Sequence, residues 1–152
     1  MKESTTALKR TPIKGDIHKR VPQRPAAALT DIYVSQKSKI PVIVKRIRQL
    51  MMSERHESVS VHGMGAMVLR AITIAQRTQA ALENQVTLSM TTHTVTLVDD
   101  IIPHDMDEDI QSQQRQCSAI RIDLGAKPGL AELQKKVTRT ATHPSRNRKL
   151  RR

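Results

Sequence analysis

The spacing of apolar residues between residues 31 and 124 constrains the fold more than any other feature of this sequence. Short runs in which apolar and polar residues alternate are typical of strands, and two longer runs have helical spacing. Their order along the chain is β-α-β-α-β-β. This order predicts an α/β two-layer sandwich, in which a four-stranded mixed sheet packs on two helices.

The first strand-helix pair begins with the β-prone run Ile32-Tyr33-Val34. Ser38 can cap the helix that follows, and Pro41 is tolerated in its first turn. The second pair has a shorter alternating run and a longer helix. The apolar residues of these predicted elements are Ile40, Val44, Ile47 and Met51 in the first helix, Val59 and Val61 in the second strand, and Val68, Ala71, Ile72, Ala75 and Leu82 in the second helix.

The two last predicted strands lie at residues 86–98 and 120–124. In the earlier of the two, apolar residues occupy even positions at first and odd positions later, which predicts a bulge or twist near Thr91–His93. The later strand alternates Ile120, Ile122 and Leu124 with polar residues. The core of such a domain is small, so dimerisation would stabilise it.

The positive charge of the chain is concentrated at its two ends. The formal net charge is +12, yet the central residues 31–126 include ten basic and eleven acidic residues. Residues 1–30 and 127–152 are therefore predicted to be disordered basic tails around a domain at residues 31–126. Such tails attract phosphate chains without regard to sequence. Solubility, or a nuclear import signal in residues 146–152, remains an alternative interpretation.

The residue types that are rare in this chain exclude several classes of protein. Cys117 is the single cysteine, which rules out an internal disulfide framework and favours a reducing compartment. No apolar run is long enough for a membrane helix, and no secretory signal is recognisable. Tyr33 is the only aromatic residue, so a platform that stacks single-stranded bases is disfavoured. The mode of nucleic-acid binding that remains is recognition of the backbone and shape of a folded RNA or a duplex.

Two short segments are the candidate nucleic-acid site. Lys37 and Lys39 flank Ser38 after the first strand, and the turn His62-Gly63-Met64-Gly65 joins the second strand to its helix. With parallel strands, both segments lie at one edge of the sheet. Backbone N–H groups and a helix dipole could then meet a phosphate. Lys45 and Arg70, on the two helices, complete the set. A solvated lysine pair and a simple tight turn are the alternatives.

Residues for metal or catalytic chemistry are not arranged together. The six histidines are scattered without metal-ligand spacing, so we expect no metal site, no cofactor and no catalytic residues. The acids between Asp105 and Asp109 lack the glycine and distal glutamate of a calcium loop. A solvated acidic loop is the better interpretation.

Several segments together resemble a known family. The element order, Lys37-Ser38-Lys39, the glycine turn and residues 118–122 are similar to the Alba superfamily. The closer resemblance is to the smaller Alba-like protein subunits of eukaryotic RNase P and RNase MRP. It covers about residues 31–124 and is carried by the segments Asp31-Ile32-Tyr33-Val34, Val61-His62-Gly63-Met64-Gly65, Arg70-Ala71-Ile72-Thr73-Ile74-Ala75 and Thr94-Val95-Thr96-Leu97-Val98-Asp99.

The resemblance implies an RNA-binding subunit that pairs as a heterodimer with a second Alba-like subunit and grips a structured stem of the RNase P or MRP RNA. The RNA, which cuts precursors of transfer and ribosomal RNA, would be the catalyst. Other basic protein subunits, telomerase RNA in fungi, and a nuclear, nucleolar location are also implied. Lys37, Lys39 and Gly63-Met64-Gly65 would face the RNA.

One departure from the superfamily concerns the loop between the last two strands. Archaeal Alba proteins have a basic hairpin there, whereas residues 99–109 contain six acids and no Lys or Arg. An acidic loop, expected at about residues 99–116, would be repelled by phosphate and favours contact with basic proteins or solvent. Two alternatives remain: a free Alba-type homodimer that coats DNA or RNA, and a small nucleotide-binding enzyme that uses the glycine turn.

Overall fold

The computed structural model describes residues 14–141. The chain divides into two compact units. Within the described residues, one unit, here called the body, comprises Arg24–Val95 and residues 117–141. The other, here called the hairpin unit, comprises residues 14–23 together with Thr96–Gln116. Residues 1–13 and 142–152 of the predicted tails, including the import-like run at 146–152, lie outside the described residues.

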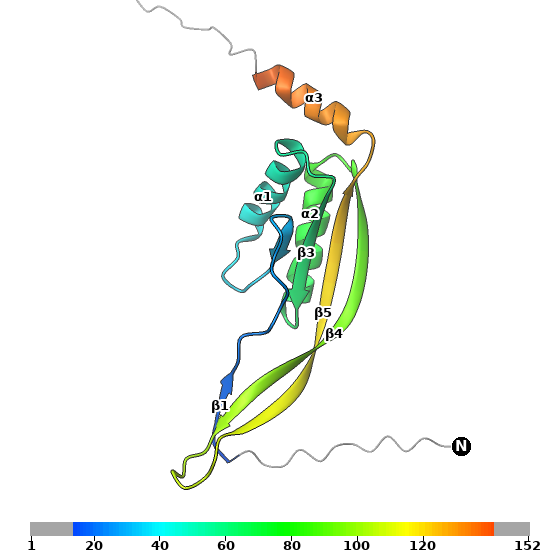
Figure 1. Ribbon diagram of the computed structural model, residues 1–152. Coiled ribbons are helices and arrows are strands. Elements are labelled where there is room, and N and C mark those ends of the chain that lie inside the picture. Colours follow the sequence, from blue (N-terminus) through cyan, green and yellow to red (C-terminus); the bar gives the residue numbers. More distant parts are fainter. Residues whose placement is uncertain (1–13, 142–152) are drawn as a thin grey trace, which may run out of the picture. The chain divides into compact units, whose positions relative to one another are not determined.

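The body contains most of the secondary structure. Its own elements are β2 (Asp31–Tyr33), α1 (Ile40–Met52), β3 (Ser58–Met64), α2 (Met67–Ala81) and α3 (Leu130–Ala141) (Figure 1). Two long strands, β4 (Val86–Ile102) and β5 (Gln111–Ala126), each contribute one part to the body and one to the hairpin unit. The hairpin unit adds β1 (Asp16–Lys19).

The strands form one mixed sheet in the order β1-β4-β5-β3-β2. In the body, β2 runs parallel to β3, with Tyr33 opposite His62, and β3 runs antiparallel to β5, with Val61 opposite Ile122. The predicted α/β class and the mixed sheet are confirmed. The predicted number of elements was too small, because the sheet has five strands and the described chain has three helices.

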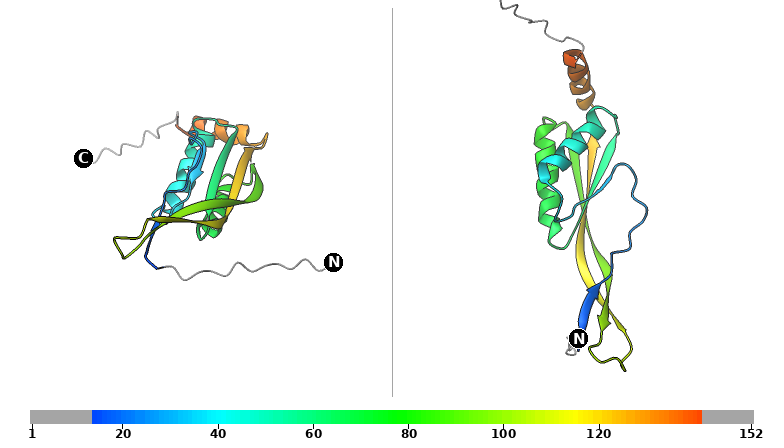
Figure 2. Two further views of the ribbon diagram at one scale, coloured as in Figure 1. Left: turned by 60° about the horizontal axis from the view of Figure 1, so that its bottom comes forward. Right: turned by 90° about the vertical axis from the view of Figure 1, so that its left-hand side faces the viewer.

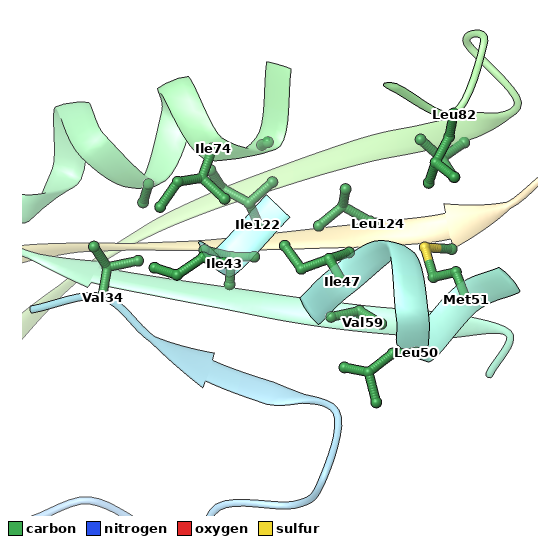
Figure 3. Packing of buried hydrophobic residues seen from close by; sticks show 14 of the residues in the cluster. Val34, Ile43, Ile47, Leu50, Met51, Val59, Ile74, Leu82, Ile122 and Leu124 are labelled. Carbon is green, nitrogen blue, oxygen red and sulfur yellow. The ribbon is translucent and has the colours of Figure 1, made fainter. Parts of the chain in front are cut away.

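The core of the body lies between α1, α2 and one face of the sheet (Figure 3). Figure 2 shows α1 and α2 beside the strands of the body. Alternate residues of β3 and β5 point into this layer, because side chains of a strand alternate between its faces. The most completely buried side chains include Ile47, Leu50, Met51, Val59, Ile74, Ile122 and Leu124.

The two additional elements lie where the sequence predicts only basic tails. β1 has one apolar residue, the half-exposed Ile17, and exists because its backbone pairs antiparallel with Asp99–Ile102 of β4. α3 has Glu132 in its first turn and buries Leu130 against the core, with Leu133 packed partly there. The loop between β4 and β5 is also shorter than expected, because the strands continue to Ile102 and resume at Gln111.

One helix end lacks a side-chain cap, and another has a common C-cap arrangement. α1 begins after Lys39, and no side chain caps it, so the predicted cap by Ser38 is wrong. α2 ends where Glu83 and Asn84 both adopt positive φ, 51° and 58°. The Asn84 N–H then donates to the Gln79 carbonyl at 2.9 Å, which closes the last turn. Among the described helices, none has both the length and the apolar character needed to cross a membrane.

Candidate nucleic-acid interface

The segment Ser35–Lys39, here called the lysine loop, connects β2 to α1. It is a closed turn: the Ser38 N–H donates to the Ser35 carbonyl at 3.1 Å, and the Ser35 N–H donates to Ser38 Oγ at 3.2 Å. The two hydroxyl oxygens are 3.0 Å apart. Ser38 thus uses its side chain to close the loop. It does not face outward as a free donor.

The lysines of this loop are exposed. Within residues 14–141, no carboxylate forms an ion pair with Lys37 or Lys39. The backbone N–H groups of both lysines also have no hydrogen-bond partner in the described part of the protein. A phosphate could therefore meet an ammonium group and a backbone donor at each of the two positions.

His62, Gly63 and Met64 form the end of β3 and Gly65 follows it, so most of the predicted glycine turn is strand. This segment still lies at the same edge of the sheet as the lysine loop, because β2 and β3 are parallel and both segments lie at the carboxyl ends of these strands. Gly63 is buried, and a Cβ there would come within 2.7 Å of the Met67 carbonyl oxygen and 2.8 Å of Ala71 Cβ. Gly63 therefore allows α2 to pack closely on β3. The predicted convergence of the two segments is confirmed.

Gly65 has a positive φ of 56°, which disfavours side chains with a Cβ. Its N–H donates to the Ser118 carbonyl at 2.8 Å, so this donor is already used inside the protein. Met64 ends β3 opposite Ala119 and is half-buried. The Gly65 N–H is therefore not available to a ligand. The Gly65 backbone is exposed, and a Cβ on it would meet Cys117 Sγ at 3.2 Å.

Arg70 joins α2 to the lysine loop. It lies in the second turn of α2 and donates from Nη2 to the Ser38 carbonyl at 2.6 Å and from Nη1 to the Gln36 carbonyl at 3.3 Å. Its Nε is buried without a hydrogen-bond partner. The sequence places Arg70 among basic residues that face a ligand, whereas the structure directs its guanidinium to the underside of the lysine loop. Lys45 is exposed on α1.

His62 lies on the sheet face opposite the helices. Its ring stacks on Tyr33, with centroids 4.5 Å apart, and its Nε2 is 3.3 Å from Asp31 Oδ1. The Arg24 guanidinium carbon lies 4.1 Å from the Tyr33 ring centroid. Tyr33 therefore packs against both an imidazole and a guanidinium, an arrangement that the sequence analysis did not anticipate. Alternation in β2 and β3 could have placed Tyr33 and His62 on one face, but not their register.

A second polar group on this face centres on Asp123 of β5. Ser60 Oγ donates to its Oδ1 at 2.5 Å, and Arg121 Nε donates to the same oxygen at 3.0 Å. Burial raises the pKa of Asp123, but these two hydrogen bonds together with nearby positive charge, chiefly on Arg121, outweigh it and the net pKa is lowered. The pKa of Asp31 is also lowered, first by the hydrogen bond from the Ala28 N–H and then by His62. The face is thus held by charged and polar contacts.

The hairpin unit has a different charge arrangement. Asp99 accepts from Arg115 Nε at 2.6 Å, and both oxygens of Asp100 accept from Arg20 at 2.6 and 2.7 Å. In the described chain, the four remaining acids of this segment form no ion pair; they are Asp105, Asp107, Glu108 and Asp109. The loop at 103–110 is thus acidic and exposed, with Met106 fully accessible.

Potential metal ligands do not gather anywhere in the described part of the chain: no group of three or more His, Cys, Asp or Glu side chains could hold an ion. His56 and His62 of the body each form a hydrogen bond with a carboxylate.

The architecture is that of the Alba proteins. The chain is similar to the crystal structure of ALBA1 from Trypanosoma brucei, with a TM-score of 0.50 over 76% of this chain and 86% of that chain. The sequence identity is 12%, so this likeness establishes the fold alone.

The sequence defines the family more narrowly. The family model described as the Rpp20 subunit of nuclear RNase MRP and P matches residues 27–123, and the chain belongs to this family. The ribonuclease P protein subunit p20 of Drosophila melanogaster is 33% identical over 107 residues, 70% of this chain and 64% of that relative. The human subunit of the same name is 29% identical over 116 residues, 73% of this chain and 83% of the relative. The chain thus spans just under two thirds of the Drosophila relative's length.

Proposed function

We propose that this chain is a non-catalytic RNA-binding subunit of RNase P and RNase MRP. It grips a structured stem of the RNA, which itself cuts precursors of transfer and ribosomal RNA. One observation supports the RNA-binding part: two exposed lysines, without carboxylate partners among the described residues, lie at the sheet edge where the glycine turn also ends. Membership of the Rpp20 family supports the assignment to these two enzymes.

The mechanism of binding is electrostatic and geometric. Lys37 and Lys39 supply charge to neutralise phosphates, and the backbone at Gly65 lets a ribose-phosphate chain approach closely. Tyr33 is already stacked on His62, so bases would not be read by stacking on it. Backbone and shape of a folded RNA are therefore the features recognised.

The assembly that we propose follows the family. The chain pairs as a heterodimer with a second Alba-like subunit in a nuclear, nucleolar ribonucleoprotein, and its acidic loop faces basic protein subunits. Charge complementarity supports this last contact, since the unpaired acids of the loop would repel RNA. Telomerase RNA is a further RNA that the same pair would bind.

The central experiment is an RNA titration at several salt concentrations with the transcribed RNase P RNA. We expect the double variant Lys37→Ala, Lys39→Ala to bind more weakly, with the salt slope reduced by about one for each lost phosphate contact. The matched control is Arg48→Ala, Arg77→Ala, which removes the same charge from exposed helix positions without an ion pair in the described chain. Wild-type affinity and slope in the lysine variant, or an equal loss in the control, would contradict the proposed site.

Copurification tests the assignment to RNase P and MRP. We expect a defined RNA and a 1:1 complex with a second Alba-like protein. Heterogeneous nucleic acid bound to a homodimer would instead indicate a coating protein, and saturable binding of a free nucleotide would indicate an enzyme.

A further inference from the structure

We propose that Arg70 is a positioning residue: it acts as a clamp that aims the backbone N–H groups of Lys37 and Lys39 toward the RNA, and does not itself contact RNA. The consequence for RNA binding rests on the function proposed above. The clamp itself is a property of the folded protein and can be measured without RNA.

Arg70 fixes the direction of two peptide units in the lysine loop. Arg70 holds the carbonyl oxygens of Gln36 and Ser38, at 3.3 and 2.6 Å from its two terminal nitrogens. No peptide bond in the described chain is cis. In a trans peptide the carbonyl and the next N–H point in opposite directions. The N–H groups of Lys37 and Lys39 therefore point away from Arg70.

The backbone N–H groups of Lys37 and Lys39 are available to a ligand. Neither has a hydrogen-bond partner in the described protein, while the Ser38 N–H between them is bonded to the Ser35 carbonyl. The loop thus directs every second donor outward. Each outward donor belongs to a residue with an exposed ammonium group, so the donors and the charges lie on the same two residues. Backbone donors of this kind, in a short loop, are suited to phosphate oxygens.

The guanidinium of Arg70 is poorly placed to bind phosphate directly. Bidentate recognition of a phosphate uses Nη2 together with either Nη1 or Nε. Nη1 and Nη2 already bond to loop carbonyls, and Nε is buried, so neither pair is openly presented to a ligand. Burying Nε without a partner is unfavourable, so the clamp is maintained against a local cost.

The reach of Arg70 depends on the glycine turn. Met67 and Ala71 are the two residues that a Cβ on Gly63 would touch, and Arg70 lies between them in sequence. Without that Cβ, α2 packs closely on β3, and Arg70 extends from it to the lysine loop. The glycine turn thus contributes to the RNA site indirectly, through the position of a helix.

The first test measures amide exchange by NMR in the full-length chain without RNA. Arg70→Ala should accelerate exchange of the Ser38 N–H by tenfold or more, since it frees the two carbonyls that fix the loop. Arg70→Gln keeps a long polar side chain if the alanine variant folds poorly, and should give the same direction. Arg77→Ala, an exposed arginine on the same helix, is the control and should leave Ser38 unchanged. Unchanged exchange in both Arg70 variants would overturn the clamp.

The second test is a double-mutant cycle with the transcribed RNase P RNA. Arg70→Ala should weaken binding by about tenfold in the wild-type background, as expected for loss of a charge-assisted hydrogen bond that orders a binding loop. In the Lys37→Ala, Lys39→Ala background it should weaken binding less than about twofold. Equal losses in the two backgrounds would mean that Arg70 contacts RNA independently, and would overturn the proposal.

The variant Arg70→Lys separates shape from charge. Lysine keeps the positive charge but lacks the planar fork that spans two carbonyls, so we expect it not to restore binding. Full rescue by lysine would overturn the clamp in favour of a simple charge. If Lys37 and Lys39 prove irrelevant to RNA while Arg70→Ala still frees Ser38, the proposed function fails but the clamp on the loop is supported.

Discussion

The body and the hairpin unit are stabilised in different ways. Every member of the buried apolar cluster belongs to the body. In the described part of the hairpin unit only Leu97 and Asp99 are buried. This unit is stabilised by backbone pairing and by the ion pairs Asp99–Arg115 and Asp100–Arg20. The comparison teaches that one chain can combine a cooperative domain, dependent on apolar burial, with a segment dependent on hydrogen bonds and charge.

The largest expected effect is a cavity in the body. Leu50→Ala removes a fully buried side chain of α1 and should lower the free energy of unfolding by about 2–5 kcal/mol. Urea denaturation followed by circular dichroism would measure it. Val42→Ala, an exposed apolar residue of the same helix, is the control and should change stability by less than about 0.5 kcal/mol. Similar losses in both variants would show that α1 is not anchored as described.

The next effect should be confined to the hairpin unit. Arg115→Ala leaves the buried carboxylate of Asp99 without its guanidinium donor. The Arg115 side chain is 40% exposed, so solvent screens the interaction. We therefore expect the stability of the hairpin unit to fall by only about 1–2 kcal/mol. Amide exchange in Asp99–Ile102 should accelerate while the urea midpoint of the body hardly moves. A coincident shift of both would mean that the two units unfold as one.

The pH dependence of the body should be smaller. The pKa of Asp123 is lowered in the folded protein, so the stability it contributes is present above the ordinary carboxylate pKa of about 4 and is lost as the pH falls through its folded pKa. Asp123→Asn should therefore cost less than about 1 kcal/mol at neutral pH, allowing for partial exposure, and the difference should vanish in acid. Urea titrations at pH 7, 4 and 2.5 would show this. A constant difference would contradict it.

The smallest expected effect concerns the acidic loop. Replacing Asp105 and Glu108 by Asn and Gln should leave RNA affinity unchanged or slightly improved, because these acids form no ion pair in the described chain and would repel phosphate. Stability should change by less than about 0.5 kcal/mol. Filter binding with the RNase P RNA would measure the affinity. A clear loss would place this loop against RNA.

Local patterns predicted the fold of the body well, since the strands and helices there have clear apolar periods. They failed for β1, whose four residues contain one apolar side chain and whose pairing partner lies about 80 residues away. No local signal specifies such a pair. The case of α3 is different. Leu130, Leu133 and Val137 do have helical spacing, but the surrounding lysines and arginines favoured the prediction of a disordered basic tail.

The candidate site shows the same division. Lys37, Lys39 and the glycine turn are recognisable from their positions after two strands, and the parallel pairing of these strands makes their convergence predictable. The role of Arg70 was not, because it depends on how closely α2 approaches β3 and on which carbonyls then come within reach. Sequence indicates which residues carry charge; packing decides which of them remain free to use it.

Tyr33 has a consequence for spectroscopy. It is the only tyrosine in a chain without tryptophan or phenylalanine, so ultraviolet absorbance near 280 nm and intrinsic fluorescence come from one known ring. That ring stacks on His62 and lies beside Arg24, and we expect both neighbours to quench its emission. The protein therefore contains a built-in optical probe of the sheet face opposite its helices, with no label required. Its emission should rise as His62 or Arg24 is replaced by alanine, which turns the signal of one side chain into a measure of local order.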